Sequence, residues 1–229
     1  MIRYFTLFLL LSPFISSSAV KQSPLWIGGD LVLYLPSNTL NEGNSIGFND
    51  VSNPGFGLKG TLDWAFQPTL LLGFETGFLK SNINMDYWGV DKYGTIEGKY
   101  VNIPFLINAK YRFPKGDVMP FFAVLFGGNM LLNSLDYSSS YDDPQYSSYS
   151  YKTTDFKPSM AFGSGIDVML SKKSILSVAV RYTYIADLEP TIIPIYDEFG
   201  YQVSEYVENV HGRQNYFEVT VGLKFGVGR

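Results

Sequence analysis

Residues 215–225 read NYFEVTVGLKF, and apolar and polar side chains alternate along this stretch. The apolar set is Phe217, Val219, Val221, Leu223 and Phe225, and the polar set includes Glu218, Thr220, Gly222 and Lys224. A repeat of two is that of a β-strand, whose successive side chains point to opposite faces. The stretch therefore predicts a strand with one apolar and one polar face, and the kind of protein depends on which face points inward.

Seven further stretches repeat this alternation. It is clearest in residues 56–66, 100–113 and 177–184, and noisier in 27–35, 70–78, 121–130 and 160–170. The connections alternate in length: 67–69, 114–118 and 171–174 are short, whereas 36–54, 83–98, 132–155 and 187–213 are long. Tight turns at one rim and long loops at the other are typical of outer-membrane barrels. The predicted fold is therefore all-β: an eight-stranded antiparallel up-and-down transmembrane β-barrel.

The composition limits the possible functions. The 229 residues are 46% hydrophobic and 17% aromatic, which is enough to form one folded domain. Cysteine is absent, which excludes disulfides, thiolate metal sites, cysteine catalysis and a lipid-modified cysteine. The formal net charge of -4 gives no basic field, so we expect no nucleic-acid partner.

The N-terminus has the features of an export signal. Arg3 precedes an apolar run over residues 4–15, and small residues follow at 17–19. We expect residues 1–19 to be a signal peptide cleaved after Ala19, which leaves residues 20–229 as the barrel domain. The alternative is a membrane anchor, but the run is shorter than the roughly 20 residues that a spanning helix needs.

The polar face of the predicted strands suits a barrel interior. It is rich in glycine: Gly57, Gly73, Gly77, Gly127, Gly163, Gly165 and Gly222. Because an eight-stranded barrel has an interior that side chains just fill, small residues there make room for long neighbours. The same face carries five acidic and five basic residues: Asp30, Asp63, Glu75, Asp167 and Glu218, with Lys59, Lys110, Arg112, Arg181 and Lys224. We expect these ten charges to form a salt-bridge network that fills the lumen.

The apolar face would then contact lipid. Aromatic residues lie near both ends of the predicted strands: Trp64, Phe66, Tyr111, Phe113 and Phe225 on the turn side, with Tyr182 and Tyr184 near the other rim. Two such levels are what the interfacial belts of a membrane barrel require. A soluble barrel with the two faces exchanged is the alternative.

Four segments resemble a known family. They are YVNIPFLINAKYRFPKG (100–116), MPFFAVLFGG (119–128), SMAFGSGIDVML (159–170) and SVAVRYTY (177–184). Together they resemble the PorT-like outer-membrane β-barrel domain family, similar in architecture to OmpX and the OmpA anchor barrel. The resemblance covers about Trp26 to Phe225. It implies an integral barrel inserted by the outer-membrane assembly machinery, although the chain continues past Phe225, where many such barrels end.

The sequence offers no pattern for catalysis. Its one histidine, His211, has no nucleophile among its neighbours in the chain, and one histidine cannot form a histidine metal cluster. Acidic residues outnumber basic ones fifteen to three in the predicted long loops, but without the ligand spacing of a calcium site. We expect a non-enzymatic protein with no cofactor and no metal.

One long loop has the composition of a binding surface. Residues 135–155 read LDYSSSYDDPQYSSYSYKTTD, with five tyrosines spaced among serines and aspartates: Tyr137, Tyr141, Tyr146, Tyr149 and Tyr151. Antibody binding loops combine rigid aromatic area with adaptable hydrogen bonding in this way. The alternatives are a mobile solvated loop, or strands that continue the hairpin above the membrane.

The predicted function is that of a structural anchor whose acidic, Tyr/Ser-rich loops recognise or adhere to an extracellular ligand. The predicted partners are outer-membrane lipid, the assembly machinery and that ligand. A narrow passive channel for small solutes is one alternative function. The other, implied by the family resemblance, is an accessory role in protein secretion with secretion components as partners.

Overall fold

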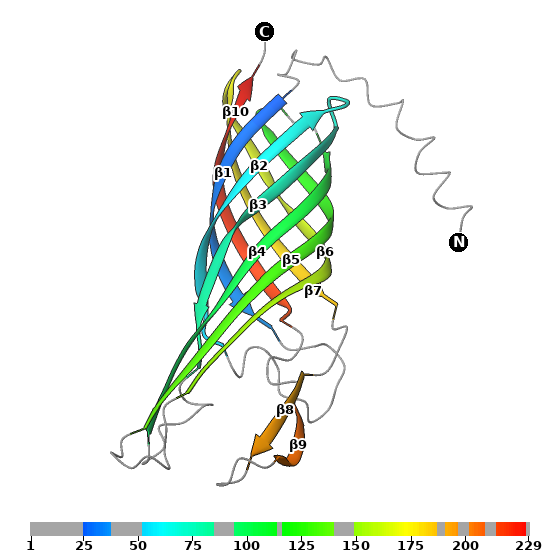
Figure 1. The fold of residues 1–229 in the computed structure, drawn as a ribbon. Helices are drawn as coiled ribbons and strands as arrows, with labels where there is room; N and C mark the ends of the chain where they lie inside the picture. Colours follow the sequence, from blue (N-terminus) through cyan, green and yellow to red (C-terminus); the bar gives the residue numbers. More distant parts are fainter. Residues whose placement is uncertain are drawn as a thin grey trace, which may run out of the picture.

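The computed structural model describes residues 25–37, 52–84, 94–113, 116–139, 149–186, 191–196, 202–208 and 214–227. The strands are β1 (Leu25–Pro36), β2 (Gly55–Ala65), β3 (Leu70–Asn82), β4 (Gly94–Arg112), β5 (Val118–Ser139), β6 (Tyr149–Ser171), β7 (Ser174–Ile185), β8 (Thr191–Tyr196), β9 (Gln202–Glu208) and β10 (Tyr216–Val227). Eight of them form a closed antiparallel barrel in the order β1-β10-β7-β6-β5-β4-β3-β2 (Figure 1). The predicted eight-stranded barrel is confirmed.

The structure corrects three of the predicted long loops. In the loop predicted at 83–98, residues 94–98 already belong to β4. Residues 132–139 belong to β5 and residues 149–155 to β6, and the two strands pair as far as Tyr137 and Tyr149. The alternative of strand extensions is therefore the correct one for these residues. Sequence alternation did not reveal them because the inward positions at the start of the β5 extension mix polar and apolar residues, with Asn133 and Leu135 both buried, whereas its Tyr and Thr residues still favour extended backbone.

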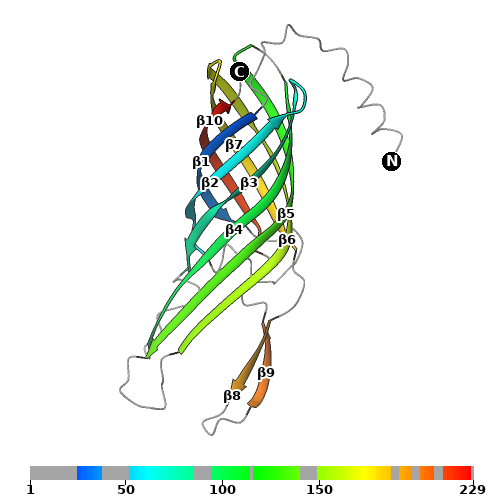
Figure 2. The ribbon, with the colours of Figure 1, turned by 45° about the horizontal axis from the view of Figure 1, so that its top comes forward.

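The fourth predicted loop also contains regular structure. Strands β8 and β9 form a separate two-stranded antiparallel sheet within residues 187–213. Figures 1 and 2 show this sheet beyond the same end of the barrel as the extensions of β4, β5 and β6. The loop end of the barrel therefore presents strand structure well past the closed wall.

The opposite end is closed by short turns. Residues 66–69 join β2 to β3, and residues 172–173 join β6 to β7. Between β4 and β5, Gly116 has a positive φ of 66°, a conformation that glycine adopts without strain. The predicted signal peptide lies outside the described residues. No helix in the described part of the chain is long and apolar enough to cross a membrane.

The outer face of the barrel is apolar. Large hydrophobic side chains are exposed on every barrel strand, among them Leu31, Leu58, Phe74, Ile107, Phe126, Ile166, Val180 and Leu223. Two of these, Leu31 and Ile107, are each 67% exposed. Since such a surface is stable only against lipid or another apolar phase, the soluble alternative is wrong.

Aromatic rings line the turn-side rim of this surface as predicted. Trp64 and Phe66 contact edge to face at 6.0 Å, and Tyr111 and Phe113 do so at 4.9 Å. Near the other rim, the ring of Tyr182 lies 4.8 Å from that of Phe217. The rings sit where an interfacial belt requires amphipathic side chains.

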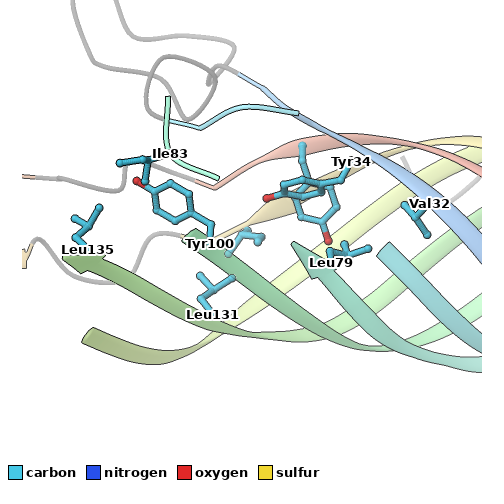
Figure 3. Packing of buried hydrophobic residues seen from close by; sticks show 9 residues of the cluster. Val32, Tyr34, Leu79, Ile83, Tyr100, Leu131 and Leu135 are labelled. Carbon is cyan, nitrogen blue, oxygen red and sulfur yellow. The ribbon is translucent and has the colours of Figure 1, made fainter. Parts of the chain in front are cut away.

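Apolar side chains fill both ends of the interior. At the turn end, where β1, β3, β5 and β7 begin, Trp26, Leu71, Met119 and Ile175 form one buried cluster. At the loop end, a larger cluster contains Val32, Tyr34, Leu79, Ile83, Tyr100, Leu131, Leu135, Ile185 and Tyr216 (Figure 3). The rings of Tyr34 and Tyr216 lie 4.7 Å apart. The charged residues of the lumen therefore lie between two apolar layers.

Candidate functional site

The first part of the lumen network joins four charged residues nearer the loop end. Lys59 Nζ lies 2.5 Å from Glu218 Oε2 and 3.3 Å from Glu75 Oε1. Arg181 Nη2 donates to Glu75 Oε2 at 2.9 Å, and its Nη1 pairs with Glu75 Oε1 as well. The two bases belong to β2 and β7, which are three strands apart in the closed barrel, so the cluster links separate parts of the wall across the lumen.

The second part lies nearer the turns and contains two separate groups. Arg112 Nε donates to Asp167 Oδ2 at 2.7 Å, and Lys110 Nζ approaches the same oxygen at 3.4 Å. Ser177 adds a hydrogen bond to Asp167 Oδ1 at 2.7 Å. In the other group, Lys224 Nζ lies 2.5 Å from Asp63 Oδ2.

The structure therefore brings nine of the ten predicted lumen charges into ion pairs. The tenth, Asp30, stands on β1 opposite Lys59 of β2 and Gly222 of β10. A Cβ atom on Gly222 would overlap the Asp30 carboxylate, so this glycine leaves the room that the acid occupies. The glycine-rich polar face predicted such contacts, in which a glycine leaves room for the longer side chain of a neighbouring strand.

A small cavity lies between the charges. One cavity of about 30 Å³ is lined by Asp30, Glu75, Lys110, Arg181 and Lys224, with smaller side chains around them. That volume is about what one buried water molecule needs. Among the described residues, the lumen thus holds nine paired charges, with a buried apolar cluster toward each end of the barrel.

Sequence reasoning missed a layer of polar side chains beside the loop-end cluster. Asn129 donates to Ser159 Oγ at 2.5 Å and accepts from the Tyr216 hydroxyl at 3.4 Å, and Asn215 Oδ1 accepts from the Ile185 backbone at 2.9 Å. The available signal was Asn129, which lies on the polar face of its predicted strand. It carried no charge and was therefore not placed in the network.

The five tyrosines of the predicted binding loop are only partly described. The backbone of Tyr137 pairs with that of Tyr149, and Leu135 pairs with Tyr151. Tyr141 and Tyr146 lie outside the described residues. Three of the five candidates therefore stand on the paired strands of one hairpin that projects from the barrel.

The acidic residues of the barrel do not gather into a metal site. Across the described ranges, no group of three or more His, Cys, Asp or Glu side chains could hold a metal ion. His211 lies outside these ranges. The carboxylates of Asp63, Glu75, Asp167 and Glu218 pair instead with lysine or arginine.

A family model for the outer membrane protein β-barrel domain matches residues 6–225. The chain belongs to this outer-membrane β-barrel family. The family places the protein in the bacterial outer membrane and agrees with the apolar outer face. The narrower PorT-like resemblance is not established by this match.

Solved structures of outer-membrane proteins resemble the chain at low identity. Neisserial surface protein A shares 14% identity and covers 90% of this chain and 98% of its own, with a TM-score of 0.49. A major outer membrane protein from Thermus thermophilus shares 11%, covers 88% and 98%, and has the same TM-score. OprG from Pseudomonas aeruginosa shares 14%, covers 90% and 98%, and scores 0.48. A search of curated protein sequences finds no match.

Proposed function

We propose that the protein is a non-enzymatic outer-membrane anchor whose sealed barrel presents a strand extension for recognition or adhesion at the cell surface. The observation that carries this proposal is the contrast between lumen and loop end. The lumen holds paired charges between two apolar clusters, whereas β5 and β6 contain 22 and 23 residues. A strand needs only about 9–11 residues to cross a bilayer.

The length of the extension supports a role outside the membrane. Roughly half of β5 and β6 exceeds the membrane requirement, and this half contains residues 135–139 and 149–155 of the Tyr/Ser-rich sequence. A paired hairpin holds its side chains with less loss of conformational entropy on binding than a flexible loop would. Such a platform suits recognition of an extracellular ligand, which is the partner we propose.

The alternative of a narrow channel has less support. Ion flow would require the Lys59, Glu75, Arg181 and Glu218 cluster and both apolar layers to move aside together. The other alternative, an accessory role in secretion, rests on the PorT-like resemblance alone. Co-purification of secretion components with the native protein would support it.

A hairpin truncation tests the proposed function. Ser134 and Lys152 are paired residues, so an Asn-Gly turn can replace residues 135–151 without changing the register below it. Full-length and truncated proteins in lipid nanodiscs would be applied to a microarray of glycans and secreted proteins. We expect both proteins to shift on heated gels, and only the full-length protein to bind. Equal binding by both, or a steady ion current through the full-length protein, would contradict the proposal.

A further inference from the structure

A polar pocket lies on the outer face of the sheet where β3 ends and β4 and β5 continue. Its volume is about 480 Å³, and its polar side chains are Asn53, Asn82, Glu97, Lys99, Ser134 and Asp136. Pockets that bind small molecules have volumes from about 300 to 1,000 Å³. The pocket is therefore large enough for a sugar-sized group.

One wall of the pocket is held in place by hydrogen bonds. The Asn53 backbone N–H donates to Asn82 O at 2.9 Å, and Asn53 Nδ2 donates to Ile83 O at 3.0 Å. Beside them, the hydroxyl oxygens of Ser52 and Ser81 lie 2.7 Å apart. The segment that precedes β2 is thus fastened across the end of β3, and the pocket is a formed feature of the fold.

The pocket begins at the upper edge of the apolar belt. Along β4 the outward side chains pass from Ile107, Phe105, Ile103 and Val101 to Lys99 and Glu97. The register aligns this change with the neighbouring strands, because Lys80 lies opposite Val101 and Ser134 lies opposite Lys99. Three adjacent strands therefore change from apolar to polar at one level, as a lipid-facing surface does where it ends.

From the apolar belt toward the loop end, the first outward polar side chains include two lysines. Lys80 on β3 and Lys99 on β4 are diagonal neighbours, and Lys152 on β6 lies opposite Ser134, the residue next to Lys99 on the other side. Diagonal neighbours have Cβ atoms roughly 7–8 Å apart, so two lysine ammonium groups can reach one phosphate.

Hydroxyl-binding groups come next. Glu97 lies directly opposite Asp136, and Asn82 and Ser134 flank them. Hydrogen bonds from Ser150 and Ser134, together with Lys152 and Lys99, lower the pKa of Asp136 below its ordinary value, so this side chain is an acceptor at neutral pH. Two opposed carboxylates repel each other, and a sugar with two neighbouring hydroxyls relieves the repulsion by donating one hydrogen bond to each.

We propose that this pocket binds the phosphorylated sugar headgroup of a glycolipid from the outer leaflet. The acyl chains lie on the apolar belt below Val101, the phosphate lies against Lys80 and Lys99, and the sugar hydroxyls bond to Glu97, Asp136 and Asn82. The phosphate and the sugar hydroxyls of such a headgroup thus both meet matching side chains directly above the apolar belt. A membrane lipid fits better than a free saccharide because the pocket adjoins the belt without a gap.

The test measures lipid binding by the full chain in mixed micelles. The probes are a phosphorylated diglucosamine glycolipid, its dephosphorylated form, phosphatidylglycerol, and the deacylated sugar phosphate. The variants are Lys80→Gln with Lys99→Gln, and Glu97→Ala with Asp136→Ala. The control is Lys172→Gln with Lys173→Gln, which removes two exposed lysines from the β6–β7 turn at the other end of the barrel. A mobility shift on heating verifies folding, and single variants replace any pair that fails it.

We expect the phosphorylated glycolipid to bind the unmodified protein and the control equally, and each pair of pocket variants about tenfold more weakly. The variant Glu97→Ala with Asp136→Ala distinguishes recognition of the sugar from simple attraction between the lysines and the phosphate. Removing two carboxylates would strengthen binding if the lysines only attracted phosphate, and that result would overturn the proposal. Equal affinity for phosphatidylglycerol would also overturn it. So would binding of the deacylated sugar phosphate as tightly as the lipid, because the pocket would then serve a soluble ligand.

Discussion

Lys224 Nζ lies 2.5 Å from Asp63 Oδ2, although their strands, β10 and β2, are separated by β1. The ion pair crosses β1 at Gly28, which is opposite Lys224 on one side and Thr61 on the other. A Cβ atom at Gly28 would lie 2.6 Å from Lys224 Cγ and 2.7 Å from the Leu223 carbonyl oxygen. The bare backbone of β1 is thus what lets the lysine reach its acid.

Breaking this pair from one side should destabilise the barrel strongly. Asp63→Leu leaves the Lys224 ammonium buried without its acid, so we expect the free energy of unfolding to fall by about 3–5 kcal/mol. Adding Lys224→Met removes the stranded charge and should restore most of the loss. Urea unfolding in lipid vesicles measures both variants. Losses that simply add in the double variant would show that the two residues are not coupled.

The two faces of β1 and β2 provide a matched pair of glycine substitutions. Gly28→Val places a side chain against Lys224, so we expect a loss of about 1–3 kcal/mol in unfolding free energy. Gly60→Val points outward, where no atom lies within 4 Å of the new Cβ, and should leave stability unchanged or raise it. Urea unfolding in lipid vesicles measures the unfolding free energy of both variants. Equal losses of unfolding free energy for the two variants would mean that replacing a glycine in the strand backbone, and not filling the lumen, lowers the stability.

The edge of the apolar belt can be located by adding charge. Ile107→Arg puts a cation on the lipid-facing side of β4 and should cost about 2–4 kcal/mol. Glu97→Arg lies on the same face of the same strand but above the lysine level, and should cost less than about 1 kcal/mol. Folding yield into vesicles gives a second readout. A large penalty at both positions would place the membrane boundary above Glu97 and remove the basis for the glycolipid pocket.

A barrel with a sealed lumen should not conduct ions. The purified protein should give no steady single-channel current in planar bilayers, because the charges pair and both ends are filled. A known porin added to the same bilayer serves as the positive control. Steady conductance in the absence of the porin would favour the channel alternative.

The tyrosines should matter for binding through their rings and hydroxyls. Alanine at Tyr137, Tyr141, Tyr146, Tyr149 and Tyr151 should abolish binding of any ligand found with the microarray. Phenylalanine at the same positions keeps the rings and should retain part of the affinity. Binding affinities of the two variants in nanodiscs make the comparison. Unchanged binding by the alanine variant would contradict a role for these residues.

The sequence by itself determined the barrel, the strand faces and the level of the aromatic rings. Two-residue alternation is a direct consequence of strand geometry, and a one-residue shift would reverse every side chain. Residues such as Phe217 and Glu218 could therefore be assigned to lipid and lumen without coordinates. The balance of five acids and five bases also indicated pairing before any distance was known.

Only the tertiary structure decided which charges pair, how far the strands run and where the pocket lies. Asp63 and Lys224 are 161 residues apart in the chain, and their contact depends on barrel closure and register. The extension of β5 carries no clear apolar alternation because its inward positions mix polar and apolar residues, with Asn133 and Leu135 both buried. The pocket exists because β3 stops while β4 and β5 continue, so its residues share a surface that no local pattern could reveal.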